Sequence, residues 1–452
     1  MSIHVQGKGC RMVAKILLDR FYIIAAPKSS NSIIEKVTPS LEDGGLVLVL
    51  AELVVYVLVL DSFGVKQEKC VVKQQEIRYN RENGKGGGGM TREYVLMNQA
   101  TPMLRFSCKR NAFDEPEFEE IEWATALRPI GYGNLHDFLA RRQAPKHRRH
   151  IKELLERYGC DDLEGFIRVT HALSLNDTFW VREADSDLAW EQVSLYINEF
   201  DQLVSEAAFD GVISETDLSS TSPEFGTDGY YAKCWVRDAD GIWLYKSGSG
   251  LHEIEPVSEY LVTQLAGQLC KNYVNYNLTV YHDKLVSKCA LFTTEATGLA
   301  KASAVFRGEQ TIPRLLETCQ SLGCDEDFRR MCVLDALTLN PDRHYGNFGF
   351  LFDNQTMEIS GMAPVFDNNR ALFPELDEDQ LAAPDWYVEH CRPKLGRDFI
   401  ITARGLMTDA IRADLEKLRG FQFANHPEHP ISEDRLDLLD SLVQRQLEQI
   451  LK

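Results

Sequence analysis

Residues 339–372 read LNPDRHYGNFGFLFDNQTMEISGMAPVFDNNRAL, and they are the most informative segment of the chain. The apolar helix predicted over residues 331–339 has to end at Pro341, because proline lacks an amide proton and clashes with the preceding turn. Two β-type runs follow, separated by Asp-Asn-Gln, which is typical of a tight turn. The pattern predicts a hairpin between two polar loops, with Asp342 on the first loop and Asp367 beside it on the second.

The polar residues of these two loops have the types and the spacing that phosphoryl transfer from ATP requires. Four residues separate Asp342 from Asn347, and Asp367 ends an apolar run. One carboxylate can accept the proton of an attacking hydroxyl, while a second carboxylate and an amide oxygen hold Mg²⁺ against phosphate oxygens. Asp-x₄-Asn is also the spacing of the kinase catalytic loop. The alternative is that Asn-Pro-Asp simply ends a helix and that both loops are ordinary polar turns.

A positive charge for the phosphates is predicted at Lys246, which follows the β-type run 242–245. In the helix predicted over residues 255–269, Glu259 can fix the position of this lysine, as the corresponding glutamate does in kinases. Glu255 is the rival partner, and the apolar face of the helix favours Glu259.

Upstream, residues 226–233 (GTDGYYAK) can form a flexible turn over the phosphates. Glycine in this stretch permits a close approach of the backbone to the phosphates. A plain hairpin turn is the alternative.

His344 lies inside the first polar loop and invites an acid–base role. We expect it instead to hydrogen-bond the loop backbone and set the shape of the loop. Arg343 is expected to be structural as well. The side chains of Trp180, Trp190 and Trp235 are assigned to the core.

Through these motifs, residues 222–372 resemble the HipA-like serine/threonine kinases, bacterial relatives of the phosphatidylinositol kinases. The HipA pattern Asn-x-Asp-x-His-x-x-Asn falls on Asn340, Asp342, His344 and Asn347. Pro-x-Tyr-Asp falls on residues 364–367, with phenylalanine at the usual tyrosine. The resemblance implies an α+β, protein-kinase-like catalytic domain with two lobes, preceded by a smaller module.

The resemblance also assigns roles to single residues. It makes Asp342 the catalytic aspartate and Asn347 and Asp367 the magnesium ligands, with Lys246 as the ATP-binding lysine. The remaining residues of the predicted nucleotide site are Glu259, Gly229, Lys233 and His344. ATP and Mg²⁺ are the expected cofactors.

Two departures from the HipA pattern stand out. HipA kinases usually carry lysine before the loop asparagine, where this chain has Gly346. The serine at which such kinases modify themselves is replaced by Gly226, with Thr227 next to it as a substitute. With Arg343, the first departure makes the loop more similar to its version in the lipid kinases, and the second puts self-inactivation by that route in doubt.

The composition indicates which classes of binding partner are excluded. The 452 residues carry a net charge of -19, which repels phosphate backbones, so no direct nucleic-acid binding is predicted. The apolar run 46–60 contains Glu52 and is too short to cross a bilayer, so no membrane association is predicted. Eleven scattered cysteines favour a reduced, cytoplasmic protein.

Changes in composition and in predicted secondary structure along the chain divide it into four predicted parts. Residues 1–89 are an extension or linker ending in the glycine run 84–89, and translation starting at Met90 is a second interpretation. Residues 90–220 are an α+β leader module, residues 221–305 a β-rich, ATP-binding lobe, and residues 306–452 a helical lobe with the catalytic loop.

Several elements are predicted from periodicity. A strand pair is expected over residues 95–107, and one amphipathic stretch over 189–208. A hairpin is expected to turn at residues 238–241. Further along, strands are expected over 278–286 and 289–293 and a helix over 398–418.

Together these observations predict ATP- and Mg²⁺-dependent phosphorylation of a protein Ser/Thr hydroxyl, in a bacterial toxin or growth regulator with an antitoxin partner. Two alternatives stay open. One is a kinase of lipids or small molecules, and the other is a nucleotide-binding module without transfer activity. The sequence carries no signal for the oligomeric state.

Overall fold

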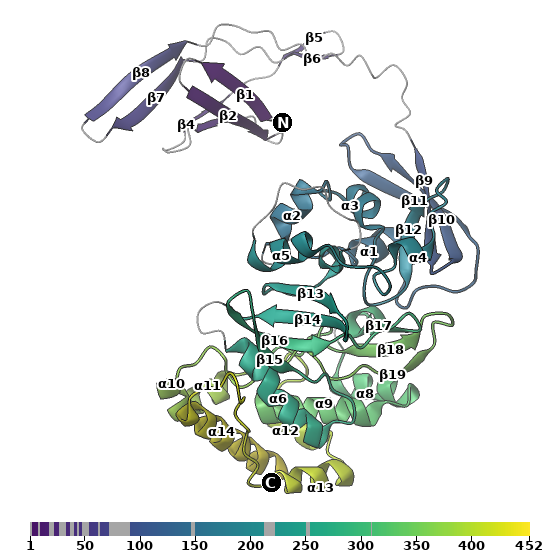
Figure 1. Cartoon of the computed structure of the whole chain (residues 1–452), viewed down its shortest axis with the longest axis vertical. Helices are drawn as coiled ribbons and strands as arrows, with labels where there is room; N and C mark the ends of the chain where they lie inside the picture. Colours follow the sequence, from purple (N-terminus) through teal and green to yellow (C-terminus); the bar gives the residue numbers. More distant parts are fainter. Residues whose placement is uncertain are drawn as a thin grey trace. The chain divides into compact units, whose positions relative to one another are not determined.

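The computed structural model describes residues 91–145, 150–211, 222–249, 254–308 and 310–452, together with strands in the first part of the chain (Figure 1). The chain forms two units, Met1–Gly88 and Gly89–Lys452. The glycine run 84–89 and Met90 lie outside the described residues.

Antiparallel strands make up the described residues of the first unit. They pair in the orders β1-β2-β3-β4, β5-β6 and β7-β8. Their bounds are β1 Ser2–Gly7, β2 Cys10–Leu17, β3 Tyr22–Ala26, β4 Ile33–Lys36, β5 Ser40–Glu42, β6 Gly45–Val47, β7 Val54–Asp61 and β8 Gly64–Val71.

The second unit begins with a sheet of order β11-β10-β9-β12 and a group of helices packed on it. The elements are β9 Arg92–Asn98, β10 Thr101–Arg110, β11 Pro116–Trp123, α1 Leu135–Ala140, α2 Ile151–Arg157, α3 Leu163–Thr170, β12 Phe179–Glu183, α4 Trp190–Val193 and α5 Gln202–Asp210. The strand pair predicted over 95–107 is confirmed as β9 and β10. The single stretch predicted over 189–208 is wrong, because the Asp201 carboxylate accepts the amide of Leu203 (3.0 Å) and starts α5 as a separate helix.

A second antiparallel sheet follows, of order β13-β14-β16-β15, and α6 packs on it. The elements are the 3₁₀ turn η1 Pro223–Gly226, β13 Lys233–Asp238, β14 Gly241–Ser247, α6 Glu255–Leu269, β15 Asn277–Tyr281 and β16 Lys284–Ala290. The predicted hairpin is confirmed, since Asp238 accepts the amides of Asp240 (2.9 Å) and Gly241 (3.1 Å) at the turn. Two strands are found where strands were predicted over 278–286 and 289–293, but these bounds are wrong, because His282 and Asp283 adopt positive φ and turn the chain between β15 and β16.

The rest of the unit combines a small sheet of order β17-β18-β19 with helices. The elements are β17 Thr297–Lys301, α7 Ala302–Val305, α8 Ile312–Ser321, α9 Asp325–Thr338, β18 Gly349–Asp353, β19 Ile359–Met362, α10 Glu378–Ala382, α11 Asp385–His390, α12 Phe399–Gly405, α13 Asp409–Lys417 and α14 Glu433–Leu451. The helix predicted over 398–418 is two helices, because the Thr408 hydroxyl accepts the amide of Ile411 and caps α13.

The largest core joins α6 to α9, α12 and α14, so α6 connects the second sheet to the helical part. As predicted, α9 ends before Pro341, and the β18–β19 hairpin lies between two polar loops. The predicted α+β class is therefore confirmed. Among the described residues, no helix is long and apolar enough to span a bilayer.

Candidate functional site

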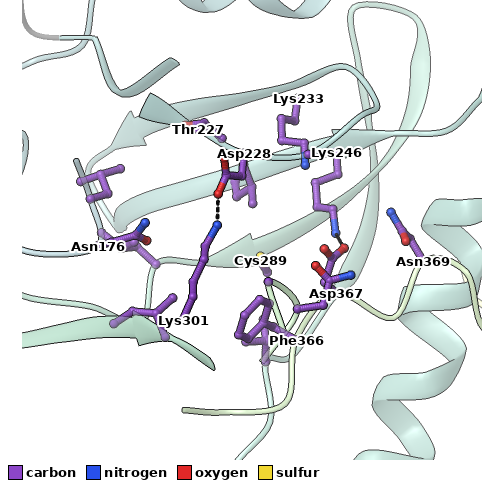
Figure 2. A pocket seen from close by; sticks show the side chains of 18 of the residues that line it. Asn176, Thr227, Asp228, Lys233, Lys246, Cys289, Lys301, Phe366, Asp367 and Asn369 are labelled. Atoms are coloured by element: carbon purple, nitrogen blue, oxygen red, sulfur yellow. Dashed lines mark hydrogen bonds and ion pairs between the residues drawn. The ribbon is translucent and has the colours of Figure 1, made fainter. Parts of the chain in front are cut away.

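A cavity of about 650 Å³ opens between the second sheet and the two polar loops, residues 340–347 and 366–370 (Figure 2). Part of its wall is apolar, formed by Leu244, Val274, Cys289, Phe292 and Phe366. Another part carries charged and amide side chains, from Lys233, Lys246, Lys301, Asp342, Asn347 and Asp367. A ligand with a flat apolar body and an anionic tail fits this division.

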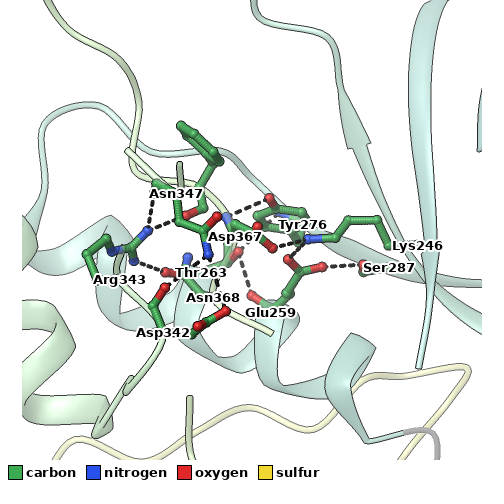
Figure 3. Close-up of polar contacts among 11 residues, drawn as sticks. Lys246, Glu259, Thr263, Tyr276, Ser287, Asp342, Arg343, Asn347, Asp367 and Asn368 are labelled. Carbon is green, nitrogen blue, oxygen red and sulfur yellow. Dashed lines mark hydrogen bonds and ion pairs between the residues drawn. The ribbon is translucent and has the colours of Figure 1, made fainter. Parts of the chain in front are cut away.

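Lys246 stands at the centre of the charged part. Its ammonium donates to Glu259 of α6 and to Oδ1 of Asp367, at 2.7 Å for the second contact (Figure 3). Glu259 also accepts from the Ser287 hydroxyl on β16. Lys246 therefore contacts Glu259 and not the rival candidate Glu255, as the apolar face of the helix predicted.

The charges in this cluster stabilise one another. Although burial disfavours the ammonium, Asp367 and Glu259 raise the pKa of Lys246 above its ordinary value. Burial raises the pKa of Glu259, and Lys246 opposes that shift. Burial also favours the neutral form of Asp367, but Lys246 and Lys233 hold the pKa of that carboxyl below its ordinary value. Asp367 is therefore ionised at neutral pH.

Lys233 faces the same region as Lys246. The two lysines are direct partners on β13 and β14, and both are buried. Like charges placed opposite each other on neighbouring strands repel, so such a pair needs negative charge nearby. Figure 2 shows both side chains extending toward Asp367, and the cavity beside them can accept further anionic groups.

The 226–233 loop closes over this part of the cavity. Gly229 adopts φ +113°, a conformation that favours glycine, and a Cβ there would lie 2.0 Å from Nζ of Lys233 and would displace the end of that side chain. The Thr227 hydroxyl donates to the Pro223 carbonyl (2.7 Å) and accepts from the half-buried Trp235 indole (2.9 Å). These contacts fix the start of the loop against β13.

Arg343 connects the two polar loops through hydrogen bonds. Its guanidinium is 1% exposed and donates to Asp335 of α9, at 2.9 Å for the shorter contact to Oδ1. It also donates to the carbonyls of Asn347 (2.7 Å) and Phe366, and to the side chain of Asn368. The structural role predicted for Arg343 is confirmed, and it extends to both loops at once.

Asp342 and Asn347 lie together on the first loop. The Asn347 amide donates to the Asp342 carbonyl (3.0 Å) and more weakly to its carboxylate (3.4 Å), so the amide oxygen remains to face a cation. The Asp342 carboxylate also accepts from Lys394, which follows α11. Asp342 is thus a half-buried carboxylate with a cation on one side.

His344 shapes the first loop as predicted, because its Nδ1 accepts the amide of Gly346 (2.9 Å). Burial lowers the pKa of His344 below its ordinary value of 6.5. The unfolded chain therefore binds a proton at a higher pH than the folded chain, and stability is lost as pH falls below about 6.5. We expect His344→Gln to reduce the drop in unfolding midpoint between about pH 8 and pH 5.5. An identical drop in the variant and the wild type would contradict this assignment.

Sequence reasoning missed three contributions to the site. Lys301 enters the cavity from β17, and Lys394 reaches Asp342 from beyond α11. From the part of the chain before the second sheet, Leu175 and Asn176 line the cavity, and the Leu175 carbonyl accepts from the Thr293 hydroxyl (2.5 Å). None of these residues belongs to a recognisable motif, since tertiary contacts alone bring them to the cavity or, for Lys394, to Asp342.

Among the residues that the structure describes, no group of three or more His, Cys, Asp or Glu side chains is gathered for a metal ion. The oxygens of Asp367 and Asn347 are the donors that a hard cation prefers. A small set of this kind suits Mg²⁺, which uses one or two protein carboxylates together with substrate phosphates and water.

No family model matches the chain, and no curated protein matches it in sequence. Its structure is similar to that of the proinflammatory kinase CtkA of Helicobacter pylori, with 18% identity and a TM-score of 0.38, over 48% of this chain and 91% of CtkA. It is also similar to HipA in the toxin–antitoxin complex of Shewanella oneidensis MR-1 with HipB and operator DNA, with 13% identity and a TM-score of 0.46, over 79% of this chain and 97% of the other. At these identities and TM-scores the similarities do not show the function, and the evidence for it lies in the residues of the site.

Proposed function

We propose that this protein transfers the terminal phosphoryl group of ATP to a hydroxyl group, with Mg²⁺ as cofactor. The observation that carries the proposal is the contact of Lys246 with both Glu259 and Asp367 at the cavity that Asp342 and Asn347 also line. A lysine held by a helix glutamate, next to a metal-binding aspartate, is the arrangement that kinases use to position ATP phosphates.

Each residue has a role in this proposal. The apolar wall takes the base, and Lys246 and Lys233 take the phosphates. Asp342 orients the acceptor hydroxyl and accepts its proton as the new phosphate–oxygen bond forms and ADP leaves. Asp367 and Asn347 would hold Mg²⁺, which when bound neutralises charge on the phosphates.

A protein Ser/Thr hydroxyl is the proposed acceptor. A net charge of -19 disfavours contact with anionic membranes, which weakens the alternative of a lipid kinase. The resemblance of the polar loops to the HipA pattern supports a protein substrate, and the antitoxin partner expected from it stays a prediction.

The first test is transfer of label from γ-labelled Mg-ATP by the purified full-length protein, with total bacterial protein as the acceptor. We expect labelled protein that disappears with EDTA and falls by roughly 10²- to 10⁴-fold in Asp342→Asn, because the general base is lost. Asp437→Asn is the matched control, since Asp437 is an exposed carboxylate on α14 outside the cavity.

The outcomes separate the candidate functions. Label in lipid or small-molecule fractions alone would replace the protein acceptor but keep the reaction. ATP binding without any transfer would favour the nucleotide-binding module. Equal label in the wild type and Asp342→Asn would contradict the assignment of the base.

A further inference from the structure

Lys301 is a partly buried cation of the cavity that no motif accounts for. Its side chain is 23% exposed and crosses the cavity to form an ion pair with Asp228 of the 226–233 loop (Figure 2). Burial lowers the pKa of Lys301 to about 8, and Asp367 opposes that shift. An ammonium that is largely shielded from water in this way is stabilised by an anion beside it.

The backbone fixes Lys301 relative to the 340–347 loop. Lys301 pairs with Gly349 across the β17–β18 ladder. The next two amides continue the connection, since Ala302 donates to the Phe348 carbonyl (2.9 Å) and Ser303 to the Tyr345 carbonyl (2.9 Å). The backbone of Lys301 is therefore fixed relative to the loop that carries Asp342 and Asn347, and the lysine does not lie on a free loop.

The 340–347 loop supplies no cation at position 346, where the residue is Gly346. The His344 ring lies close to this position because its Nδ1 accepts the Gly346 amide. A cation for the phosphate nearest the acceptor would then come from another element. Lys301 lines the cavity, whereas Lys394 does not line it and is 53% exposed.

Asp228 is a replaceable partner for Lys301. It is half-exposed and belongs to a loop that turns at Gly229. A single carboxylate carries less charge than the end of a triphosphate, so a bound nucleotide can take its place on the ammonium. Release of Asp228 would exchange one ion pair for another without leaving Lys301 unpaired.

Resting on the proposed function, we propose that Lys301 binds the terminal phosphate of the nucleotide, and that Asp228 occupies this place when no nucleotide is bound. Lys301 thereby supplies, from β17, the charge that the 340–347 loop lacks. The assignment makes Lys301 a residue that distinguishes ATP from shorter nucleotides, because AMP has no phosphate that reaches it.

The test is calorimetric titration of the full-length protein with Mg·AMP-PNP, Mg·ADP and AMP. We expect Lys301→Met to weaken binding of AMP-PNP by about 10- to 100-fold, the size of a lost charge-assisted hydrogen bond, and that of AMP by less than about 2-fold. Lys301→Arg, which keeps the charge, should retain most of the preference for AMP-PNP. Asp228→Asn should tighten AMP-PNP binding by about 3- to 10-fold, because the competing anion is removed.

A second lysine–aspartate pair provides the matched controls. Lys284 and Asp210 are 3.0 Å apart and lie outside the cavity, so Lys284→Met and Asp210→Asn should bind all three nucleotides as the wild type does. Failure of the wild type to bind any nucleotide would overturn the proposed function and this inference with it. Nucleotide binding by the wild type with no loss in Lys301→Met, or with an equal loss for AMP and AMP-PNP, would overturn this inference alone.

Discussion

Replacing Asp367 by asparagine should lower phosphoryl transfer by at least about 10³-fold, the scale on which phosphoryl-transfer enzymes depend on the groups that neutralise transition-state charge. The substitution keeps the shape of the side chain and removes the charge that would ligate Mg²⁺. Lys246 retains Glu259, so its ammonium stays paired and the fold should persist. The measurement is the initial rate of label transfer as a function of Mg²⁺ concentration.

The dependence on Mg²⁺ makes this prediction specific. If Asp367 ligates the cation, the residual rate of Asp367→Asn should need a higher Mg²⁺ concentration than the wild type. Asp437→Asn should behave as the wild type, because this carboxylate is exposed and outside the cavity. A wild-type rate in Asp367→Asn at low Mg²⁺ would remove Asp367 from the site.

Replacing Arg343 by methionine should destabilise the second unit by about 3–5 kcal/mol, the usual cost of leaving one partner of a buried ion pair uncompensated. Burial raises the pKa of Asp335, and Arg343 opposes that shift, so the carboxylate loses its main counter-charge in the variant. The carbonyls of Asn347 and Phe366 lose their donor as well. The measurement is the midpoint of denaturant-induced unfolding.

A double substitution separates the buried charge from the lost packing. In Arg343→Met with Asp335→Leu no unpaired carboxylate remains, so the double variant should be more stable than Arg343→Met alone. Arg419→Met is the control, since Arg419 pairs with Glu416 at the surface and its loss should leave the unfolding midpoint unchanged. A midpoint equal to that of the wild type in Arg343→Met would contradict the role given to this residue.

Local signals in the sequence were sufficient for the elements that carry the motifs. The bounds predicted for α6 agree with the structure, because its apolar spacing and its proline in the first turn are both local features. The hairpin after Pro341 was also predictable, since Asp353 begins a turn by accepting two backbone amides. These elements place Asp342, Asn347 and Asp367 at one cavity.

Other parts of the site depend on pairings between distant segments. Lys301 enters the cavity because β17 pairs with β18 across roughly fifty residues, and nothing near Lys301 in the sequence reveals that register. Leu175 and Asn176 reach the cavity through contacts with distant residues, since their carbonyls accept from the Thr293 hydroxyl and from the Leu299 amide of β17. The helix starts after Asp201 and Thr408 are not visible in the apolar periodicity, because they depend on the side chains of these two N-cap residues.

The anchoring of both polar loops by Arg343 has a consequence for the turnover cycle. One buried guanidinium holds the 340–347 loop, the 366–370 loop and α9 together. These three segments therefore have to move as a single body or stay in place. The 226–233 loop on the other side of the cavity is held differently, by the Thr227–Trp235 hydrogen bond and the Asp228–Lys301 ion pair. Under the proposed function, entry of ATP and release of ADP would then depend on movement of the 226–233 loop, and that movement would set the rate of nucleotide exchange.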